Sequence, residues 1–352
     1  MRKVTLISIV MLVVAGMLLS ACAPAATPAA AKKKIAAVLD TGGENDKSFN
    51  QYTLQGAKDA AAKLGFDMSY VVSASSSDYE KNIETFVSEK ADMIITVGFL
   101  MGDATAAMAK KYPNIKFAII DVAYFPTAGS AACPDTAKDC YADGGLTNVT
   151  SLMFQEDQVG YEAGVLAGCM SKSGTVATVS GMEIPPVVRY VVGFQNGAKS
   201  VNPNVKTLNI YIPNFNDPTT GKQAGADFVS QGADVVFGVG GNTGNGGLLA
   251  AKEKGLMAIG VDVDQYNTYP EVKDALITSA QKNMDVATNA AVTAFAAGTL
   301  KAGIQTGNAA NGGIGLAPYH DWDSKISADC KAKVDAAVKG LKDGSVQTGY
   351  KP

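Results

Sequence analysis

The chain carries the same short sequences twice, in the same order and at a nearly constant separation. The segment 86–92 (Phe-Val-Ser-Glu-Lys-Ala-Asp) recurs at 228–234 as Phe-Val-Ser-Gln-Gly-Ala-Asp. Three further matches keep this order at nearly the same offset: Gly56-Ala57-Lys58 with 197–199, Val97-Gly98 with 239–240, and Asp121 with Asp262. A period this long is that of a whole domain rather than of a solenoid unit. We therefore expect two similar lobes with a cleft between them, where small ligands commonly bind.

Short apolar runs alternate with amphipathic patterns in both halves, which predicts α/β lobes built on parallel sheets. We expect strands at 35–39, 70–73, 93–97, 117–120, 176–179, 207–211, 235–239, 257–261 and 276–280. We expect helices at 51–64, 79–90, 104–111, 158–170, 190–200, 222–231, 248–254, 284–297 and 328–341. The turn-rich segment 123–148 is expected as a loop, either at the mouth of the cleft or on the surface.

Composition limits the class of protein. With 352 residues, 47 % hydrophobic and 18 % charged, the chain fits a packed globular protein of about two domains. Its formal net charge is −3, and loss of a signal peptide carrying Arg2 and Lys3 leaves 30 − 2 = 28 basic and 33 acidic residues, a net charge of −5. Nothing in this balance favours a nucleic-acid partner, which prefers a basic face.

Residues 1–22 have the pattern of an export signal. Arg2 and Lys3 precede an apolar run at 7–19 that is too short to span a membrane. The run ends in Leu-Ser-Ala-Cys22, which resembles a bacterial lipobox, so Cys22 is expected to carry a diacylglycerol; the alternative is an ordinary signal peptide. Residues 23–34 are expected to form a flexible tether. No later segment is long and apolar enough for a membrane span.

Four more cysteines follow Cys22. Cys133 and Cys140 flank six residues of a turn-rich loop, and a local disulfide is plausible in an exported protein. Cys169 lies on an apolar helix face, where burial is the commoner fate, and the sequence leaves its pairing with Cys330 open. Zinc binding is disfavoured because the chain has a single histidine and no Cys-x-x-Cys motif. No metal or other cofactor is expected.

Polar and aromatic residues gather where strands end, and ligands of parallel sheets bind beyond those ends. The candidate ligand-binding residues are Asp40, Asn45, Asp46, Phe49, Asp121, Met182, Phe215, Gly240, Gly241, Asp262 and Lys282. Carboxylates accept hydrogen bonds from sugar hydroxyls and aromatic rings stack on flat bases, so the set suits a ligand with both parts.

Each candidate also has a structural interpretation. Asn45 and Asp46 could cap the following helix, and the two phenylalanines could belong to the core. Lys282 could serve only as a partner of a carboxylate. Asp121 and Asp262 favour a site more strongly, because they end strands at equivalent positions of the repeat.

Other chemistries find less support. The glycines at 238–244 imitate a dinucleotide-binding loop, but Thr243 stands where Gly-x-Gly-x-x-Gly requires glycine. Asp262 and Asp264 lack the glycine and distal glutamate of a calcium loop. The lone His320 and the absence of a Gly-x-Ser-x-Gly motif argue against an enzyme. The best enzymatic alternative is hydrolysis of a glycosidic bond by paired carboxylates across the cleft.

Several of these segments together resemble the basic membrane protein family, specifically the PnrA-like purine nucleoside receptors of ABC transporters. The resemblance rests on Asp-Thr-Gly-Gly-Glu-Asn-Asp-Lys-Ser-Phe-Asn at 40–50, Phe-Ala-Ile-Ile-Asp at 117–121, Gly-Met-Glu at 181–183, Gly-Phe-Gln-Asn-Gly at 193–197, Phe-Asn-Asp-Pro at 215–218, the glycine-rich stretch 241–246, and Ile-Gly-Val-Asp-Val-Asp-Gln at 259–265. Two departures concern ligand choice: the loop with Cys133 and Cys140 is longer than usual, and Asn242 stands where glycine is commoner.

The resemblance implies a type I periplasmic-binding-protein fold, two Rossmann-like lobes joined by hinge strands. The expected lobes are 35–150 with 281–312, and 151–280 with 313–352. By resemblance, Phe49 and Phe215 would sandwich the purine, Asp40 would contact its edge, and the ribose would be held by Asp121, Asp262 and Lys282 beside Gly240 or Gly241.

The function implied is that of a monomeric receptor, lipid-anchored on the extracytoplasmic face of the cell membrane. It would capture a nucleoside by hinge closure and pass it to an ABC permease with its ATPase. The alternative within the same fold is a receptor for a sugar or an autoinducer. The alternative from another class is an exported nucleoside hydrolase that uses the cleft carboxylates.

Overall fold

Two six-stranded sheets share one strand order. The computed structural model describes residues 32–351, so the signal peptide, Cys22 and most of the expected tether lie outside the described residues. In spatial order, the first sheet contains β11 (Gly303–Gly307), β5 (Val149–Phe154), β4 (Lys116–Ile120), β3 (Met93–Val97), β1 (Lys34–Leu39) and β2 (Asp67–Val72). The second contains β12 (Ile314–Leu316), β10 (Leu276–Lys282), β9 (Met257–Asp262), β8 (Val235–Val239), β6 (Thr175–Ser180) and β7 (Lys206–Tyr211). Neighbouring strands are parallel except β10 and β12.

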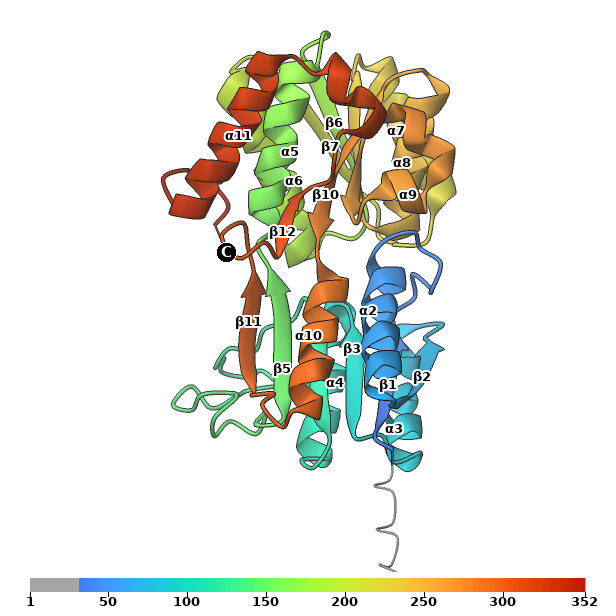
Figure 1. Ribbon diagram of the computed structural model, residues 1–352, viewed down its shortest axis with the longest axis vertical. Helices are drawn as coiled ribbons and strands as arrows, with labels where there is room; N and C mark the ends of the chain where they lie inside the picture. The colour runs from blue at the N-terminus through green and yellow to red at the C-terminus, as the bar shows by residue number, and fades with distance from the viewer. Residues whose placement is uncertain (1–31, 352) are drawn as a thin grey trace, which may run out of the picture. The chain divides into compact units, whose positions relative to one another are not determined.

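Helices cover both sheets (Figure 1). We define lobe 1 as the first sheet with α2 (Phe49–Leu64), α3 (Tyr79–Ser88), α4 (Gly102–Lys111) and α10 (Met284–Ala296). Lobe 2 is the second sheet with α5 (Glu156–Met170), α6 (Pro185–Val201), α7 (Pro218–Ser230), α8 (Gly241–Glu253), α9 (Gln265–Thr268) and α11 (Ala328–Asp343). Single 3-10 segments occur at Ser76–Asp78, Phe99–Met101, Pro270–Ala275 and His320–Lys325. The expected two-lobe α/β architecture is thus present.

The repeat explains why one helix pair in each lobe packs closely. Gly56 of α2 faces α10, and a Cβ atom there would lie 2.3 Å from the carbonyl oxygen of Asp285. Its repeat partner Gly197 of α6 faces α5, where a Cβ would lie 2.1 Å from the carbonyl oxygen of Tyr161. Any side chain at either position would force the two helices apart, so the repeated glycine preserves a shared packing contact.

The structure adds three strands that the sequence pattern did not predict, β5, β11 and β12. The predicted lobe boundary at residue 150 falls inside β5, which pairs with β4 and runs on to Phe154, so the chain leaves the first sheet only after that residue. β11 is an edge strand with three exposed residues, and β12 is three residues long. Short edge strands of this kind show little alternation of apolar and polar residues, so the sequence pattern does not reveal them.

Three chain segments cross between the sheets, and hydrogen bonds join them. Asn283 lies between β10 and α10. Its backbone N–H donates to the carbonyl oxygen of Gly313 at 3.0 Å, and its side-chain N–H donates to the carbonyl oxygen of Gly312 at 2.7 Å. The N–H of Gln155, between β5 and α5, donates to the carbonyl oxygen of Gly307 at 2.9 Å. The crossings are short and adjacent, which is the arrangement that a hinge requires.

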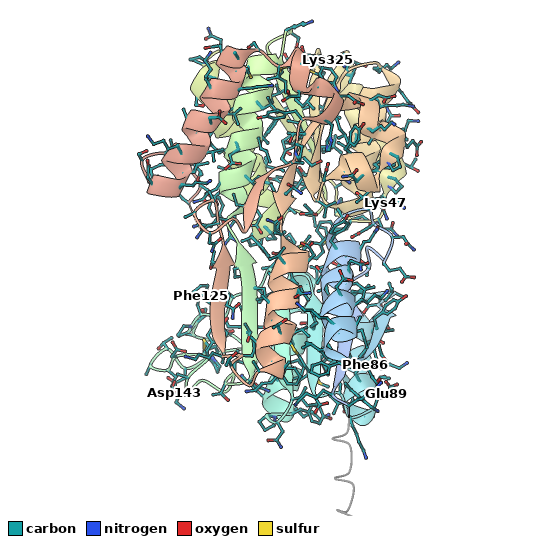
Figure 2. The ribbon with its side chains drawn as sticks, viewed as in Figure 1. Lys47, Phe86, Glu89, Phe125, Asp143 and Lys325 are labelled. Atoms are coloured by element: carbon teal, nitrogen blue, oxygen red, sulfur yellow. A yellow bond between two sulfur atoms is a disulfide. The ribbon has the colours of Figure 1, made fainter. Side chains whose placement is uncertain are left out.

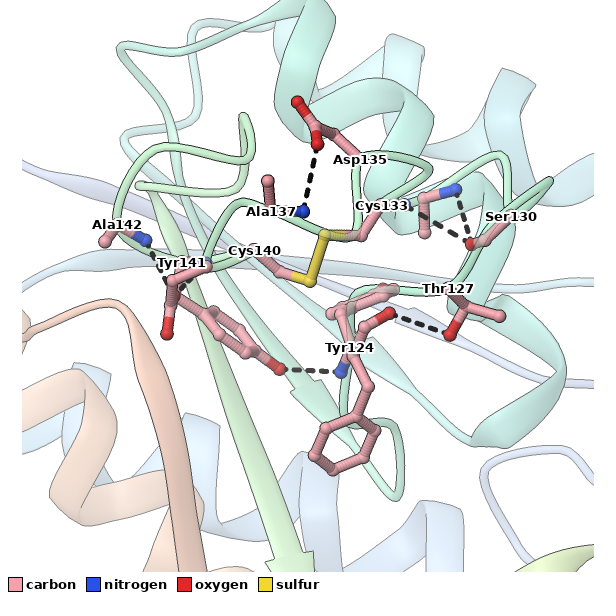
Figure 3. The surroundings of a disulfide bond; sticks show 12 residues. Tyr124, Thr127, Ser130, Cys133, Asp135, Ala137, Cys140, Tyr141 and Ala142 are labelled. Carbon is pink, nitrogen blue, oxygen red and sulfur yellow. Dashed lines mark hydrogen bonds between the residues drawn. A yellow bond between two sulfur atoms is a disulfide. The ribbon is translucent and has the colours of Figure 1, made fainter.

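The long loop 123–148 lies on lobe 1 and contains a disulfide between Cys133 and Cys140, with Cα atoms 5.7 Å apart (Figure 3). The Tyr141 hydroxyl accepts a hydrogen bond from the N–H of Tyr124 at 2.9 Å, which ties both ends of the loop together. Phe125 in this loop is 64 % exposed. Within residues 32–351, no helix is both long and apolar enough for a membrane crossing.

Candidate functional site

A cavity lies between the two lobes, at the carboxyl ends of their strands. Its lobe 1 lining consists of Asp40, Gly42, Asp46, Phe49, Asn50, Gly98, Phe99, Leu100 and Asp121. Its lobe 2 lining consists of Ile184, Pro186, Val187, Tyr190, Phe215, Val239, Gly240, Gly241, Val261, Asp262 and Lys282, the last extending from β10. The lining combines apolar surface with a few buried charges, as small-molecule sites do.

The two repeat-related aspartates have the same unusual backbone. Asp121 follows β4 with φ of 67°, and Asp262 ends β9 with φ of 66°. Left-handed φ angles are uncommon outside glycine, although aspartate and asparagine tolerate them better than other residues. Both side chains are buried, 4 % and 6 % exposed, and both line the cavity. Backbone strain retained at the same place in both halves of a repeat is typical of a functional position.

Repeat-related glycines also line the cavity. Gly98 and Gly240 have φ angles of 115° and 110°. A Cβ atom at Gly98 would lie 2.9 Å from a carboxylate oxygen of Asp40, and one at Gly240 would lie 2.8 Å from the backbone nitrogen of Gly181. Both positions therefore need glycine for conformation and for space.

Lys282 connects the lobes through buried ion pairs. Its Nζ lies 2.7 Å from Oδ2 of Asp121 and 3.2 Å from Oε1 of Glu156, and all three side chains are at most 4 % exposed. Arg189 contacts the other oxygen of Glu156 at 3.3 Å. Burial by itself lowers the pKa of Lys282, but the carboxylates of Asp121, Glu156 and Asp262 outweigh it and raise the pKa above its usual range. Lys282 is therefore a fixed cation in the cavity wall.

Asp262 has no such partner in direct contact among the described residues. Burial raises its pKa to about 6; Lys282 opposes this rise, and the negative charges of Asp121 and Asp46 add to it. The hydroxyl of Tyr190 donates a hydrogen bond to Oδ1 of Asp262 at 3.3 Å. Across the cavity, Oδ1 of Asp121 is buried without a hydrogen-bond partner in the described part of the chain. The site thus presents an unpaired acceptor on Asp121 and an incompletely compensated carboxylate on Asp262, as expected where a ligand supplies donors.

The loop before α2 places two further carboxylates. Asp46 accepts hydrogen bonds from the backbone N–H groups of Ser48, Asn50 and Gln51 at 2.8–3.2 Å. It thus satisfies free N–H groups at the start of α2, although the N-cap position is Ser48, and it also lines the cavity. Burial raises the pKa of Asp46 to about 6 despite these bonds. Asp40 accepts from the side chain of Asn50 at 2.8 Å, and burial raises its pKa as well.

Two aromatic rings line the cavity from opposite lobes. Phe49 is the first residue of α2, and Phe215 lies in the loop between β7 and α7. Gly181 gives the Phe215 ring its space, because a Cβ atom there would lie 2.4 Å from the ring. Neither ring is fully buried. Two apolar faces that enter one cavity can hold a flat ligand ring between them.

The structure separates two candidates from the rest. Asn45 is exposed and Met182 is half-buried, and neither lines the cavity. Asp46, next to Asn45, lines the cavity, and so does Ile184, two residues after Met182. The sequence reasoning missed Tyr190 and Glu156, which reach the network from helices α6 and α5. Glu156 has no sequence signal, since it precedes the predicted helix at 158, whereas Tyr190 was identified only as a helix start.

Hydrogen bonds also join the lobes beside the cavity. The side-chain N–H of Asn245, in α8, donates to the backbone carbonyl oxygen of Asp46 at 3.0 Å. The hydroxyl of Thr268, in α9, donates to the backbone carbonyl oxygen of Lys47 at 2.7 Å. Gln265 holds Asn245 through a bond of 2.8 Å. Figure 2 shows Lys47 where the lobe 1 loop meets lobe 2. We name Asn245, Gln265 and Thr268 the latch. Among residues 32–351, no cluster of three His, Cys, Asp or Glu side chains could hold a metal ion.

Comparison with known proteins gives this site its context. Residues 33–341 match the family described as ABC transporter substrate-binding protein PnrA-like. The ABC transporter nucleoside-binding protein BmpA of Lactococcus lactis is 31 % identical over 325 residues, covering 86 % of each chain. A protein of Pyrococcus abyssi named as an uncharacterized lipoprotein is 31 % identical over 308 residues, 84 % of this chain and 70 % of its own.

The solved structures agree on the fold. The crystal structure of an ABC transporter solute-binding protein from Aeropyrum pernix superposes with a TM-score of 0.77 at 26 % identity, covering 90 % of this chain and 92 % of that one. The predicted periplasmic-binding-protein fold and the predicted family are both confirmed. The matched region includes both sheets and every residue of the cavity, so the chain belongs to the PnrA-like (Bmp) family of ABC transporter substrate-binding proteins.

Proposed function

We propose that this substrate-binding protein captures a nucleoside, with purine nucleosides preferred, in the cavity between its lobes. One observation carries the proposal: two aromatic rings and two strained, buried aspartates enter the same cavity from opposite lobes. The rings suit a flat base, while the carboxylates suit the hydroxyls of a ribose. The similarity to a relative named as nucleoside-binding supports the same choice.

Binding would proceed by hinge closure. The three adjacent crossings can absorb a rotation of one lobe against the other, and the latch then holds the lobes together. Asp121 and Lys282 would be positioned before the ligand arrives, because their ion pair fixes both side chains. Such preorganisation reduces the entropy lost on binding.

The protein would then hand the ligand to the permease and ATPase of an ABC importer. We propose that it works as a monomer, since one chain supplies the whole lining of the cavity. We also propose that Cys22, which lies outside the described residues, carries a lipid anchor on the extracytoplasmic face of the membrane. The lipobox-like sequence and the relative named as a lipoprotein support this. A Cys22→Ala chain should lose both acyl labelling and its place in the membrane fraction.

Calorimetric titration tests the ligand. The purified chain is unfolded and refolded to remove any bound ligand, then titrated with purine and pyrimidine nucleosides, free bases and ribose. We expect submicromolar binding of purine nucleosides with no release of free base. Competition by ribose but not by adenine would instead favour the sugar receptor, and appearance of free base would favour the hydrolase. No binding of any nucleoside would overturn the proposal.

A further inference from the structure

Two cysteines far apart in the sequence lie on neighbouring helices of lobe 2. Cys169 lies in the last turn of α5 and is half-buried, while Cys330 lies in the first turn of α11 and is 3 % exposed. Both pack into the same hydrophobic cluster, and each thiol is the largest influence on the pKa of the other. Helices α5 and α11 pack side by side, so the contact is held by the fold (Figure 1).

The surroundings favour reaction at one of the two sulfurs. The Ser327 hydroxyl caps α11 by accepting from the backbone N–H of Cys330 at 3.2 Å, which fixes the helix start that carries this cysteine. The interaction with the Cys330 thiol lowers the pKa of Cys169 to about 7; burial opposes this effect, and Lys333 supports it. The same interaction raises the pKa of Cys330. Because the thiolate is the nucleophile in disulfide exchange, the half-buried Cys169 is the attacking sulfur.

We propose that Cys169 and Cys330 form a redox-active thiol pair that closes to a second disulfide and joins α5 to α11. The Cys169 thiolate attacks the disulfide of an oxidant, either a small-molecule disulfide or a thiol–disulfide oxidoreductase, and releases one thiolate from it. Cys330 then loses its proton and attacks the Cys169 sulfur, and the second oxidant thiol leaves. In total, the protein loses two electrons and two protons, and the oxidant's disulfide becomes two thiols.

The bond would fasten the last helix of the chain to lobe 2. It closes a loop that runs from position 169 to position 330, almost half of the chain, and long loops give the largest loss of unfolded-state entropy. Both cysteines belong to lobe 2, so the bond does not cross the cavity and should leave ligand affinity unchanged.

Peptide mapping tests the pairing directly. The native full chain is incubated with oxidised glutathione, alkylated while denatured, and digested with trypsin. Cys133 lies in peptide 117–138, Cys140 and Cys169 share peptide 139–172, and Cys330 lies in peptide 326–331. We expect one species in which all three peptides are joined. In the Cys169→Ser variant, 326–331 should become free while the other two remain linked. Recovery of 326–331 with an alkylated thiol from the oxidised wild-type chain, with the other two peptides linked, would overturn the proposal.

Thermal unfolding gives a second readout. Oxidised wild-type protein should unfold about 5 °C or more above its Cys330→Ser variant, whereas the reduced forms should differ little. A Cys133→Ser/Cys140→Ser chain is the matched control, because it keeps the 169–330 pair and should still respond to oxidised glutathione. An equal unfolding temperature before and after proven cross-linking would refute the stabilising role.

Discussion

The two repeat-related aspartates should respond in opposite ways to the same substitution. Asparagine is the informative replacement, because it keeps the shape of aspartate and tolerates the φ angles near 66° that alanine would strain. Asp262→Asn should stabilise the ligand-free protein, and Asp121→Asn should destabilise it. The difference follows from their partners: Asp121 contacts Lys282 at 2.7 Å, whereas Asp262 has no cation in direct contact among the described residues.

The magnitude for Asp262 follows from its pKa, which burial raises from 3.8 to about 6. A carboxyl with a raised folded-state pKa contributes stability below its unfolded pKa, and this is lost as the pH rises through about 6. A shift of about 2 units corresponds to about 3 kcal/mol at pH 7.5, falling to about 1 kcal/mol at pH 4.5. The neutral amide of Asp262→Asn would avoid this loss. Asp121→Asn instead leaves Lys282 with one direct carboxylate partner and should cost about 3 kcal/mol, near the lower end for a broken buried pair.

Urea unfolding of ligand-stripped protein at the two pH values measures both effects. We expect the free energy of unfolding of Asp262→Asn to exceed that of the wild type more at about pH 7.5 than at about pH 4.5. The same variant should bind the ligand at least about tenfold more weakly, because a charge-assisted hydrogen bond contributes about 1.5–3 kcal/mol. Destabilisation of Asp262→Asn at pH 7.5, or a gain independent of pH, would refute the reasoning.

Two further perturbations probe the ion pairs and the latch. Lys282→Met should lower the free energy of unfolding by about 3–5 kcal/mol, because it leaves buried carboxylates unpaired. In urea titrations this loss of stability should become smaller as the pH falls, since the unpaired carboxylates then protonate. A loss of stability that does not depend on pH would argue against unpaired carboxylates as its cause. Asn245→Ala removes the hydrogen bond to Asp46 and should speed ligand release about fivefold in stopped-flow measurements, since such a bond contributes about 1 kcal/mol. Glu253→Ala, on the same helix but paired with Lys222 within lobe 2, is the control, and equal release rates in both variants would exclude the latch.

The sequence predicted the centre of each sheet better than its edges. Strands such as 93–97 and 235–239 are continuous apolar runs because helices cover both of their faces. β11, with the sequence Gly-Ile-Gln-Thr-Gly, is an exposed edge strand whose pairing with β5 depends on tertiary structure alone. Local pattern cannot specify a strand whose hydrogen-bond partner lies so far away along the chain.

The candidate site shows the same division. Asp121 and Asp262 were identifiable because a strand end in a repeat fixes where a side chain can go, and both line the cavity. Asn45 was predicted because its loop follows a strand end and contains other candidates. In a loop, however, side chains point inward or outward with no regular period, and the side chain of Asn45 is exposed. Glu156 could not be found, since its role depends on the approach of Lys282 and Arg189 from other elements.

The charge of the cavity comes from a point where the two halves of the repeat differ. Both β5 and β10 contain Thr-Ser, at 150–151 and 278–279, and each strand ends at the third position after that serine, so Phe154 and Lys282 occupy equivalent positions. In the folded protein, Nζ of Lys282 lies 5.5 Å from the centre of the Phe154 ring. A lysine at both positions would bring two cations together, and a phenylalanine at both would leave the aspartates without a counter-ion. Because only one half carries the lysine, one aspartate is held as an ion pair while the other keeps a charge that the protein compensates incompletely. A ligand whose hydroxyl groups donate hydrogen bonds to Asp262 would compensate the negative charge of that carboxylate. Ligand binding would therefore stabilise the folded protein by removing an unfavourable charge that the ligand-free protein retains.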